Sequence, residues 1–281
     1  MKNKKNISWI LGIATLALFI GALYFFLAPR PLSHMKMADV ANNYQIDKIS
    51  IKEIEKNKKK RNSISSEVEG IGTKVTEKEE VPIFPSDDNR EIPTATNTGI
   101  TFDWDSVRPI SPDTISQAKS DDLPVVGGIA IPELGVNLPI FKGVSNSNLT
   151  YGAGTMNENQ EMGEGNYGLA SHHVFSMAGA SELLFSPLDR ASKGQNIYLT
   201  DKGKVYVYEI DNIEEVTPYG SHVMDAPKRG EKPKVTLVTC TDIYGTNRRI
   251  VQGSLVEVFD WSGSSKQIKD YFKKSYNAFQ L

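Results

Sequence analysis

The segment Lys204-Val205-Tyr206-Val207-Tyr208-Glu209-Ile210 alternates with a period of two residues, as half-buried β-strands do. Other short apolar runs lie on both sides of it, separated by Gly, Pro, Asn and Asp. They cover residues 125 to 132, 136 to 141, 195 to 200, 233 to 239 and 249 to 259. Many short strands with turn signals between them predict a mainly β fold, a barrel or a sandwich, of about 155 residues.

Helical patterns are scarce in this part of the chain and are confined to residues 178 to 184 and to the tail at residues 265 to 278. In the tail, Ile268, Tyr271 and Phe272 recur at helical spacing. This spacing predicts a helix that docks on the surface of the domain.

The composition limits the classes of protein to consider. A chain of 281 residues with 39% hydrophobic residues has room for one domain of ordinary size plus appendages. A formal net charge of -2 offers no global basic surface to a nucleic-acid partner. The single cysteine excludes an intramolecular disulfide and any zinc site built from several cysteines.

The N-terminal region predicts a membrane anchor. Residues 7 to 28 carry no charged side chain, and a helix of this length is roughly 33 Å long, enough to span a bilayer. Bulky residues 24 to 27 fill the place of a signal-peptide cleavage site, which favours an uncleaved anchor. Three lysines in residues 1 to 6 predict a cytoplasmic N-terminus, with the long remainder outside the cell.

Residues 29 to 104 are predicted to form a juxtamembrane helix and a flexible linker. Apolar side chains recur at loosely helical intervals between Val40 and Ile54, ahead of the basic run at residues 56 to 61. That run either contacts anionic lipid or wall polymer or is simply solvated, and we favour the solvated interpretation. The composition of residues 62 to 104 is typical of a disordered tether.

Cys240 ends the apolar run at residues 233 to 239 and precedes a polar, glycine-containing segment at residues 241 to 247. A lone cysteine is either a small buried hydrophobe or a reactive thiol, and a strand end next to a loop suits access. Acyl transfer by a thiol also needs a proton donor and an oxyanion stabiliser. The histidines available in the same domain are His172, His173 and His222.

Arg248 is the candidate for the oxyanion stabiliser. If residues 241 to 247 form a loop between adjacent antiparallel strands, Arg248 returns beside Cys240. An arginine at that place lowers the pKa of the thiol and offers a fixed fork of hydrogen-bond donors. The alternative is an exposed arginine on a strand.

The segment Thr236-Leu237-Val238-Thr239-Cys240 resembles the TLxTC signature of sortases, which an arginine follows at the start of the next strand. The segment Leu169-Ala170-Ser171-His172-His173 is similar to the one that carries the catalytic histidine in the streptococcal housekeeping type. Residues 144 to 156 resemble the loop between early strands in that family. The resemblance implies a closed β-barrel of about eight strands with short helices at residues 105 to 262, followed by a helical tail at 263 to 281.

The resemblance also implies an activity, that of a class A cysteine transpeptidase anchored in the membrane of a Gram-positive cell. Cys240 would attack the Thr-Gly bond of an LPxTG-like sorting signal and hold the acyl group as a thioester. His172 would protonate the leaving amine, and Arg248 would stabilise the oxyanion. Ser171 and Thr239 flank these residues and are candidate substrate contacts.

Two adjacent pairs make the assignment of the histidine and the arginine less direct. Register with the family pattern picks the first member of each pair, His172 rather than His173 and Arg248 rather than Arg249. Strand alternation supports this choice in part, because only one of two neighbours can face the cleft.

The resemblance implies partners and a subclass as well. The expected partners are secreted proteins with an LPxTG-like signal, a lipid II-like peptidoglycan precursor that supplies the amine, and the membrane. Calcium-dependent relatives carry an acidic cluster in the loop that corresponds to residues 143 to 156, where this chain has no Asp or Glu. We therefore expect no calcium requirement, no metal site and no cofactor. Residues 102 to 105 lack the proline of the lid motif of pilus-building relatives, which favours the housekeeping class.

Two alternatives remain at this stage. One is a different extracytoplasmic cysteine peptidase or a peptidoglycan hydrolase, although papain-like enzymes place Cys before His in the chain, the reverse of the order here. The other is a membrane-tethered β-domain that binds wall or host ligands and merely buries Cys240.

Overall fold

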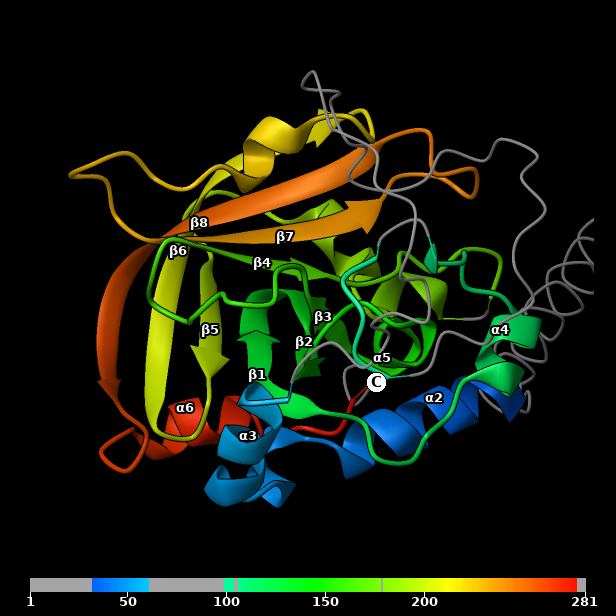
Figure 1. Ribbon diagram of the computed structural model, residues 1–281, viewed down its shortest axis with the longest axis horizontal. Coiled ribbons are helices and arrows are strands. Elements are labelled where there is room, and N and C mark those ends of the chain that lie inside the picture. Colours follow the sequence, from blue (N-terminus) through cyan, green and yellow to red (C-terminus); the bar gives the residue numbers. More distant parts are fainter. Residues whose placement is uncertain (1–31, 61–98, 104–105, 178, 277–281) are drawn as a thin grey trace, which may run out of the picture.

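Eight strands close a barrel in the part of the chain that the structure describes. The structure is a computed structural model that describes residues 32–60, 99–103, 106–177 and 179–276. The strand order around the barrel is β1-β2-β3-β4-β7-β8-β6-β5 (Figure 1). The strands are β1 (Val125–Ile131), β2 (Val136–Phe141), β3 (Ala153–Thr155), β4 (Asn166–Ala170), β5 (Asn196–Thr200), β6 (Lys204–Val216), β7 (Lys234–Cys240) and β8 (Arg248–Asp260). The prediction of a mainly β fold with a closed barrel is confirmed.

Neighbouring strands of the barrel are antiparallel except at two places. β2 runs parallel to β3, and β4 runs parallel to β7. A parallel pair needs a long crossover, and the chain between β4 and β7 forms β5 and β6 on the way. This crossover places β4 and β7 side by side with their C-terminal ends at the same edge of the sheet.

Residues 204 to 210, whose alternation predicts a half-buried strand, lie within β6. Val205 and Val207 are buried and Tyr206 is half-buried, as the alternation requires. The pairing with β8 shifts register between Val207 and Tyr208, so the buried face continues at Tyr208, which is fully buried. A bulge of this kind bends a strand and changes which residues face inward. The hydroxyl of Tyr208 accepts a hydrogen bond from the Gly163 backbone N–H at 2.9 Å.

The two strands that the alternation does not reveal are β3 and β4. They have three and five residues, too few to show a period, and each contains a glycine. A Cβ at Gly168 of β4 would lie 2.2 Å from the Cε atom at the flexible end of Met224, so a larger residue there needs that side chain to move. Glycine inside a strand often marks such a close approach.

The predicted helix at residues 178 to 184 is wrong. Residues 180 to 182 form a single 3-10 turn, η4 (Ala180–Glu182), and a second one follows, η5 (Ser186–Arg190). Gly179 and Leu184 adopt positive φ angles of 70° and 50°, which no α-helix accommodates. The loop expected at residues 144 to 156 contains a short helix, α5 (Asn146–Tyr151), capped by the side chain of Ser145.

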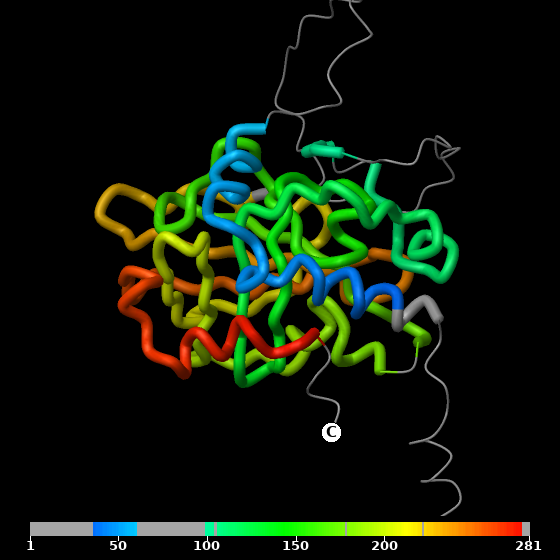
Figure 2. Tube along the Cα trace, turned by 90° about the horizontal axis from the view of Figure 1, so that it is seen from below, coloured from blue at the N-terminus to red at the C-terminus, as the bar shows by residue number. Residues whose placement is uncertain are grey.

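The segment before the barrel packs on it as two helices, α2 (Leu32–Asn43) and α3 (Ile51–Lys58). The C-terminal helix α6 (Lys266–Tyr271) overlaps α3 in Figure 1, but the view from below in Figure 2 shows that these two helices are apart. The N-terminal and C-terminal segments are joined by hydrogen bonds, among them one from the Gln45 side chain to the Lys274 carbonyl at 2.5 Å. Phe272, just after α6, is fully buried, so the tail is docked as the sequence predicts.

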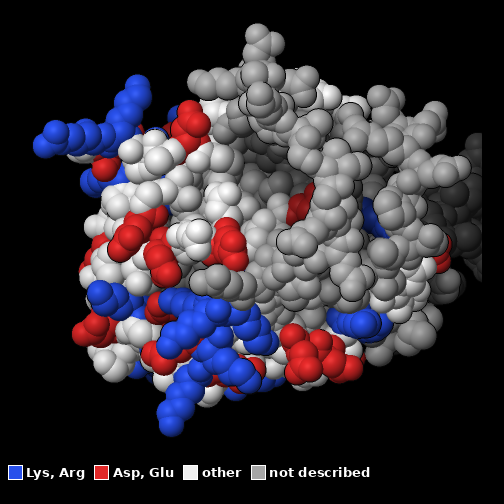
Figure 3. All heavy atoms as spheres, in the orientation of Figure 1, with Lys and Arg blue, Asp and Glu red and all other residues white. Residues whose placement is uncertain are grey.

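Basic side chains gather over α3 (Figure 3). Lys52, Lys56, Lys59 and Lys60 are exposed, whereas Ile54 of the same helix is buried against the barrel. In the described part of the basic run, Lys56, Lys59 and Lys60 are exposed to solvent, whereas Lys58 is half-buried and pairs with Asp201 at 2.7 Å.

Several predictions fall on residues that the structure does not describe. These are the membrane anchor at residues 7 to 28 and most of the tether at residues 62 to 104. Among the described residues, none of the helices has the length and apolar character to cross a membrane. Residues 99 to 103 are described, and there the Thr101 carbonyl accepts a hydrogen bond from the Val144 N–H at 2.7 Å.

Candidate active site

Cys240 and Arg248 face each other across two adjacent antiparallel strands. They are register partners at the end of β7 and the start of β8. Directly opposed residues of such a pair point to the same face, with Cβ atoms about 5 Å apart. Cys240 is half-buried, and Arg248 is only 2% exposed. The loop expected at residues 241 to 247 is confirmed, and it returns the arginine beside the cysteine.

The loop between β7 and β8 is shaped by Asp242. Its carboxylate accepts hydrogen bonds from the backbone N–H groups of Tyr244 and Thr246 and from the Thr246 hydroxyl. Gly245 adopts a φ of +66°, the left-handed conformation that glycine accepts most easily. This turn exposes carbonyl oxygens to Arg248, whose Nη1 donates to Gly245 at 2.6 Å and to Asn247 at 3.0 Å.

The charges around Cys240 act in opposite directions. Burial raises the pKa of the Cys240 thiol, the Arg248 guanidinium lowers it, and the Asp242 carboxylate raises it, with a net rise. Burial lowers the pKa of Arg248, an effect that Cys240 and Asp242 oppose, but a guanidinium still stays charged at neutral pH. Without substrate the cysteine is therefore mainly a thiol with a cation beside it.

His172 reaches the same place from the neighbouring parallel strand. The β4–β7 register pairs Ala170 with Val238, and the Ser171 N–H donates to the Val238 carbonyl at 3.2 Å. His172 follows Ser171 just beyond the end of β4, at the edge of the sheet where Cys240 ends β7, and adjacent strands lie about 4.8 Å apart. The sequence places the histidine just beyond a strand end, and the parallel pairing with β7 brings that end to the cysteine.

The imidazole of His172 is buried. The residue is 8% exposed, and burial lowers its pKa to about 4. Its backbone carbonyl accepts a hydrogen bond from the Phe185 N–H at 3.1 Å. His172 is therefore a neutral imidazole at neutral pH, held by its backbone at the edge of the sheet.

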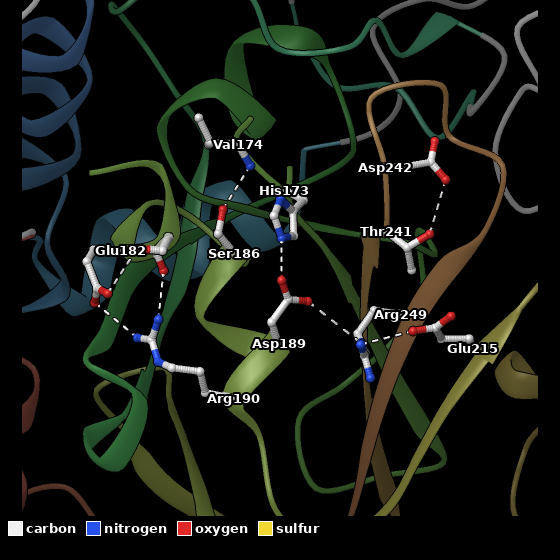
Figure 4. Close-up of polar contacts among 11 residues, drawn as sticks. His173, Val174, Glu182, Ser186, Asp189, Arg190, Glu215, Thr241, Asp242 and Arg249 are labelled. Carbon is white, nitrogen blue, oxygen red and sulfur yellow. Dashed lines mark hydrogen bonds and ion pairs between the residues drawn. The ribbon is translucent and has the colours of Figure 1, made fainter. Parts of the chain in front are cut away.

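The second member of each pair lies in a different environment. The His173 Nε2 atom is 2.8 Å from the Asp189 Oδ2 atom, and the Arg249 Nη2 atom is 2.9 Å from the Glu215 Oε1 atom (Figure 4). Arg249 also lies 3.8 Å from Asp189 through its Nε atom. The structure thus brings His172, Cys240 and Arg248 to one edge of the sheet and ties His173 and Arg249 to carboxylates.

Of the remaining candidate residues, Ser171 and His222 have partners in the protein, whereas Thr239 has none among the described residues. The Ser171 hydroxyl donates to the Gly152 carbonyl at 2.7 Å, inside the protein. Thr239 is 1% exposed, and its hydroxyl has no hydrogen-bond partner among the described residues. His222 is exposed in the 3-10 turn η6 (Ser221–Met224), with its Nε2 atom 3.8 Å from Glu214. Substrate contacts by Ser171 and Thr239 stay a prediction.

Sequence reasoning missed Asp189 and Asp242. Asp242 has a detectable signal, since Asp followed three residues later by Gly is typical of a turn. Asp189 has none, because its partners His173 and Arg249 are distant in the sequence and meet it only through the barrel topology. No group of three or more His, Cys, Asp or Glu within the described ranges is arranged to hold a metal ion.

Comparisons with known proteins agree with this arrangement. Residues 129–256 match the sortase domain among models of protein families. Over 291 aligned residues the chain is 40% identical to sortase A of Streptococcus agalactiae, and the alignment covers 100% of both chains. The chain belongs to the sortase family. It is a cysteine transpeptidase, and the resemblance to class A sortases is confirmed, whereas the catalytic role of Cys240 stays a prediction.

Other relatives match about half of this chain. Sortase A of Listeria monocytogenes is 38% identical over 153 residues, which are 54% of this chain and 66% of that protein. The crystal structure of the Listeria monocytogenes sortase A superposes with a TM-score of 0.48 at 36% identity, covering 53% of this chain and 98% of that one. The alternatives of a papain-like peptidase and of a binding module with an inert cysteine do not apply to a member of this family.

Proposed function

We propose that the enzyme cleaves LPxTG-like sorting signals between Thr and Gly and joins the new carboxyl end to an amine of a cell-wall precursor. The observation that carries the proposal is the meeting of His172, Cys240 and Arg248 at the ends of three adjacent strands. These residues supply the nucleophile, the proton carrier and the cation that acyl transfer needs.

The first step of the proposed reaction begins from neutral groups. Because the pKa of Cys240 is raised and that of His172 is lowered to about 4, thiol and imidazole are both uncharged at neutral pH. As the sulfur attacks the carbonyl carbon of Thr, the proton moves from the sulfur to the imidazole. The S–C bond forms, and the carbonyl electron pair becomes the oxyanion of the tetrahedral intermediate.

Arg248 is the proposed stabiliser of that oxyanion. Its Nη1 atom is held by the carbonyls of Gly245 and Asn247, so the guanidinium is oriented before substrate arrives. Donors that are fixed in advance stabilise developing charge strongly because nothing has to reorganise during the reaction. The same cation favours the thiolate over the thiol of Cys240.

The later steps return every group to its starting state. Protonated His172 gives its proton to the departing Gly amine as the C–N bond breaks, which leaves a thioester on Cys240. An incoming amine then attacks the thioester, gives its proton to His172 and forms a new amide bond. The thiolate leaves and takes the proton back from His172.

The proposed setting is the outer face of the membrane of a Gram-positive cell, with residues 7 to 28 as the anchor. The substrates are then secreted proteins with the sorting signal, and the acceptor is the amine of a lipid II-like precursor. We also propose that the reaction needs neither calcium nor another cofactor, since residues 143 to 156 contain no Asp or Glu.

The test is incubation of the purified chain with an LPxTG peptide and an amine acceptor, followed by mass spectrometry of the products. We expect cleavage after Thr, a Thr–acceptor amide, and loss of both in Cys240→Ala. A chelator should leave the rate unchanged, whereas a rate that falls with chelator and returns with calcium would contradict the cofactor proposal. Cleavage at another bond, or turnover by Cys240→Ala, would overturn the proposed function.

A further inference from the structure

One carboxylate, that of Asp189, contacts the second member of both adjacent pairs (Figure 4). Its Oδ2 atom lies 2.8 Å from the His173 Nε2 atom, and its Oδ1 atom lies 3.8 Å from the Arg249 Nε atom. Asp189 belongs to η5, which is part of neither β4 nor β8. It therefore links the two chain segments that carry His172 and Arg248 through a third element.

On the histidine side, η5 and the residue before it hold the chain around His172 at three successive positions. The Phe185 N–H donates to the His172 carbonyl at 3.1 Å, and the Val174 N–H donates to the Ser186 hydroxyl at 2.8 Å. Between these two backbone contacts, the His173 side chain meets Asp189. Of these three contacts, the one with Asp189 extends to β8, because the same carboxylate also lies near Arg249.

On the arginine side, Arg249 lies between two carboxylates. Glu215 is its cross-strand register partner on β6, and Asp189 approaches from η5. Because successive side chains of a strand point to opposite faces, fixing Arg249 on this face fixes Arg248 on the other. The orientation of β8 at its first residues thus depends on the ion pairs of Arg249.

We propose that Asp189 is a positioning residue for the transfer reaction, setting His172 and Arg248 relative to Cys240 through His173 and Arg249. The inference rests on the proposed function, and Asp189 itself touches none of the three residues at the reacting edge. Its role is to hold the segment around His172 and the start of β8 in a fixed relative position.

The effect of such a residue falls on the chemical step. A misplacement of about 1 Å can cost on the order of a hundredfold in rate, and removal of one of several supports should cost less, about tenfold in kcat. We expect that loss in Asp189→Ala with KM changed by less than about twofold, since the substrate-binding surface is intact. Asp189→Asn keeps an acceptor for His173 and should retain more of kcat than Asp189→Ala.

The matched control is Glu182→Gln. Glu182 pairs with Arg190, the residue next to Asp189, at 3.0 Å, and it contacts neither His173 nor Arg249. This variant removes one carboxylate charge from the same surface and should keep the wild-type kcat. A loss equal to that of Asp189→Ala would overturn the proposal, because it would point to a general effect of surface charge.

A double variant tests whether the two partners share one role. Asp189→Ala combined with Arg249→Met should lose little more than the more damaging single change, because both break the same contact. Fully multiplied losses would overturn the proposed link. So would unchanged kcat in Asp189→Ala and Asp189→Asn, or a loss confined to KM.

A readout without substrate separates this inference from the proposed function. Amide hydrogen exchange of residues 172 to 174 should be faster in Asp189→Ala and Asp189→Asn than in Glu182→Gln, and unchanged exchange would overturn the positioning role. If Asp189→Ala does not fold, Asp189→Asn carries both measurements. Failure of wild type to process the LPxTG peptide contradicts the proposed function alone, and the exchange result still decides the role of Asp189.

Discussion

The two members of each adjacent pair, His172 with His173 and Arg248 with Arg249, have the same chemistry and opposite surroundings. The first members are 8% and 2% exposed and are held through backbone groups at the edge that carries Cys240. The second members are bound by side-chain carboxylates, those of Asp189 and Glu215. In the proposed reaction, the surroundings of each side chain, and not its type, decide whether it takes part in the chemistry or supports a neighbour.

The largest difference should appear within the histidine pair. General acid–base catalysis contributes about 10² to 10⁴-fold, so His172→Ala should lower kcat/KM by about a thousandfold. His173→Ala removes only a supporting contact and should cost about tenfold or less. The measurement is steady-state transpeptidation of an LPxTG peptide by both variants. Equal losses, or the larger loss in His173→Ala, would reverse the assignment.

The arginine pair should show a similar but smaller difference. Arg248→Lys keeps the charge and loses the fork of donors, and removal of one oxyanion donor typically costs about 10² to 10³-fold in kcat. Arg249→Lys can still pair with Glu215 and should lose about tenfold or less in kcat. Quenched transpeptidation assays with an amine acceptor measure kcat for the two variants. A mild loss of kcat in Arg248→Lys would show that the bidentate role is wrong.

The titration of Cys240 distinguishes the two arginines without substrate. A cation beside a thiol favours the thiolate, so removing it raises the pKa further above its ordinary value. In Arg248→Met the midpoint of alkylation should move to higher pH, whereas in Arg249→Met it should stay in place. The rate of iodoacetamide labelling against pH reports on this residue alone, because the chain has a single cysteine. A midpoint that moves only in Arg249→Met would contradict the geometry.

The smallest effect concerns stability on the supporting face. The Arg249–Glu215 ion pair is partly exposed, with side-chain exposures of 25% and 48%. Such pairs contribute about 0 to 1 kcal/mol, so Glu215→Gln should lower the free energy of unfolding by less than about 1 kcal/mol. Urea denaturation measures the change, and it should shrink further at high salt. A loss of several kcal/mol would mean that the pair is not the solvated contact described above.

The sequence predicts most of the barrel because its long strands carry a readable period. Alternation and apolar content alone predict residues 204 to 210 and the runs that correspond to β1, β2, β5, β7 and β8. β3 and β4 were not, since three and five residues with a glycine give no period. The helix expected at residues 178 to 184 fails because Gly179 and Leu184 adopt left-handed backbone conformations.

The sequence predicts the candidate catalytic residues but not the carboxylate that contacts their neighbours. Cys240 and Arg248 are close in sequence, so one loop between antiparallel strands is enough to pair them. His172 came from the family resemblance, because its approach to Cys240 depends on the parallel pairing of β4 with β7. No sequence pattern predicts the role of Asp189, since it meets Arg249 only because the fold places η5 beside β8.

The covalent intermediate can be observed in the intact mass of the enzyme mixed with an LPxTG peptide and no acceptor amine. We expect an adduct that equals the peptide up to Thr joined to Cys240, released when an amine is added. The adduct should be absent in Cys240→Ala, strongly reduced in His172→Ala and still present in His173→Ala. An adduct that survives Cys240→Ala, or one that needs His173 and not His172, would contradict the account.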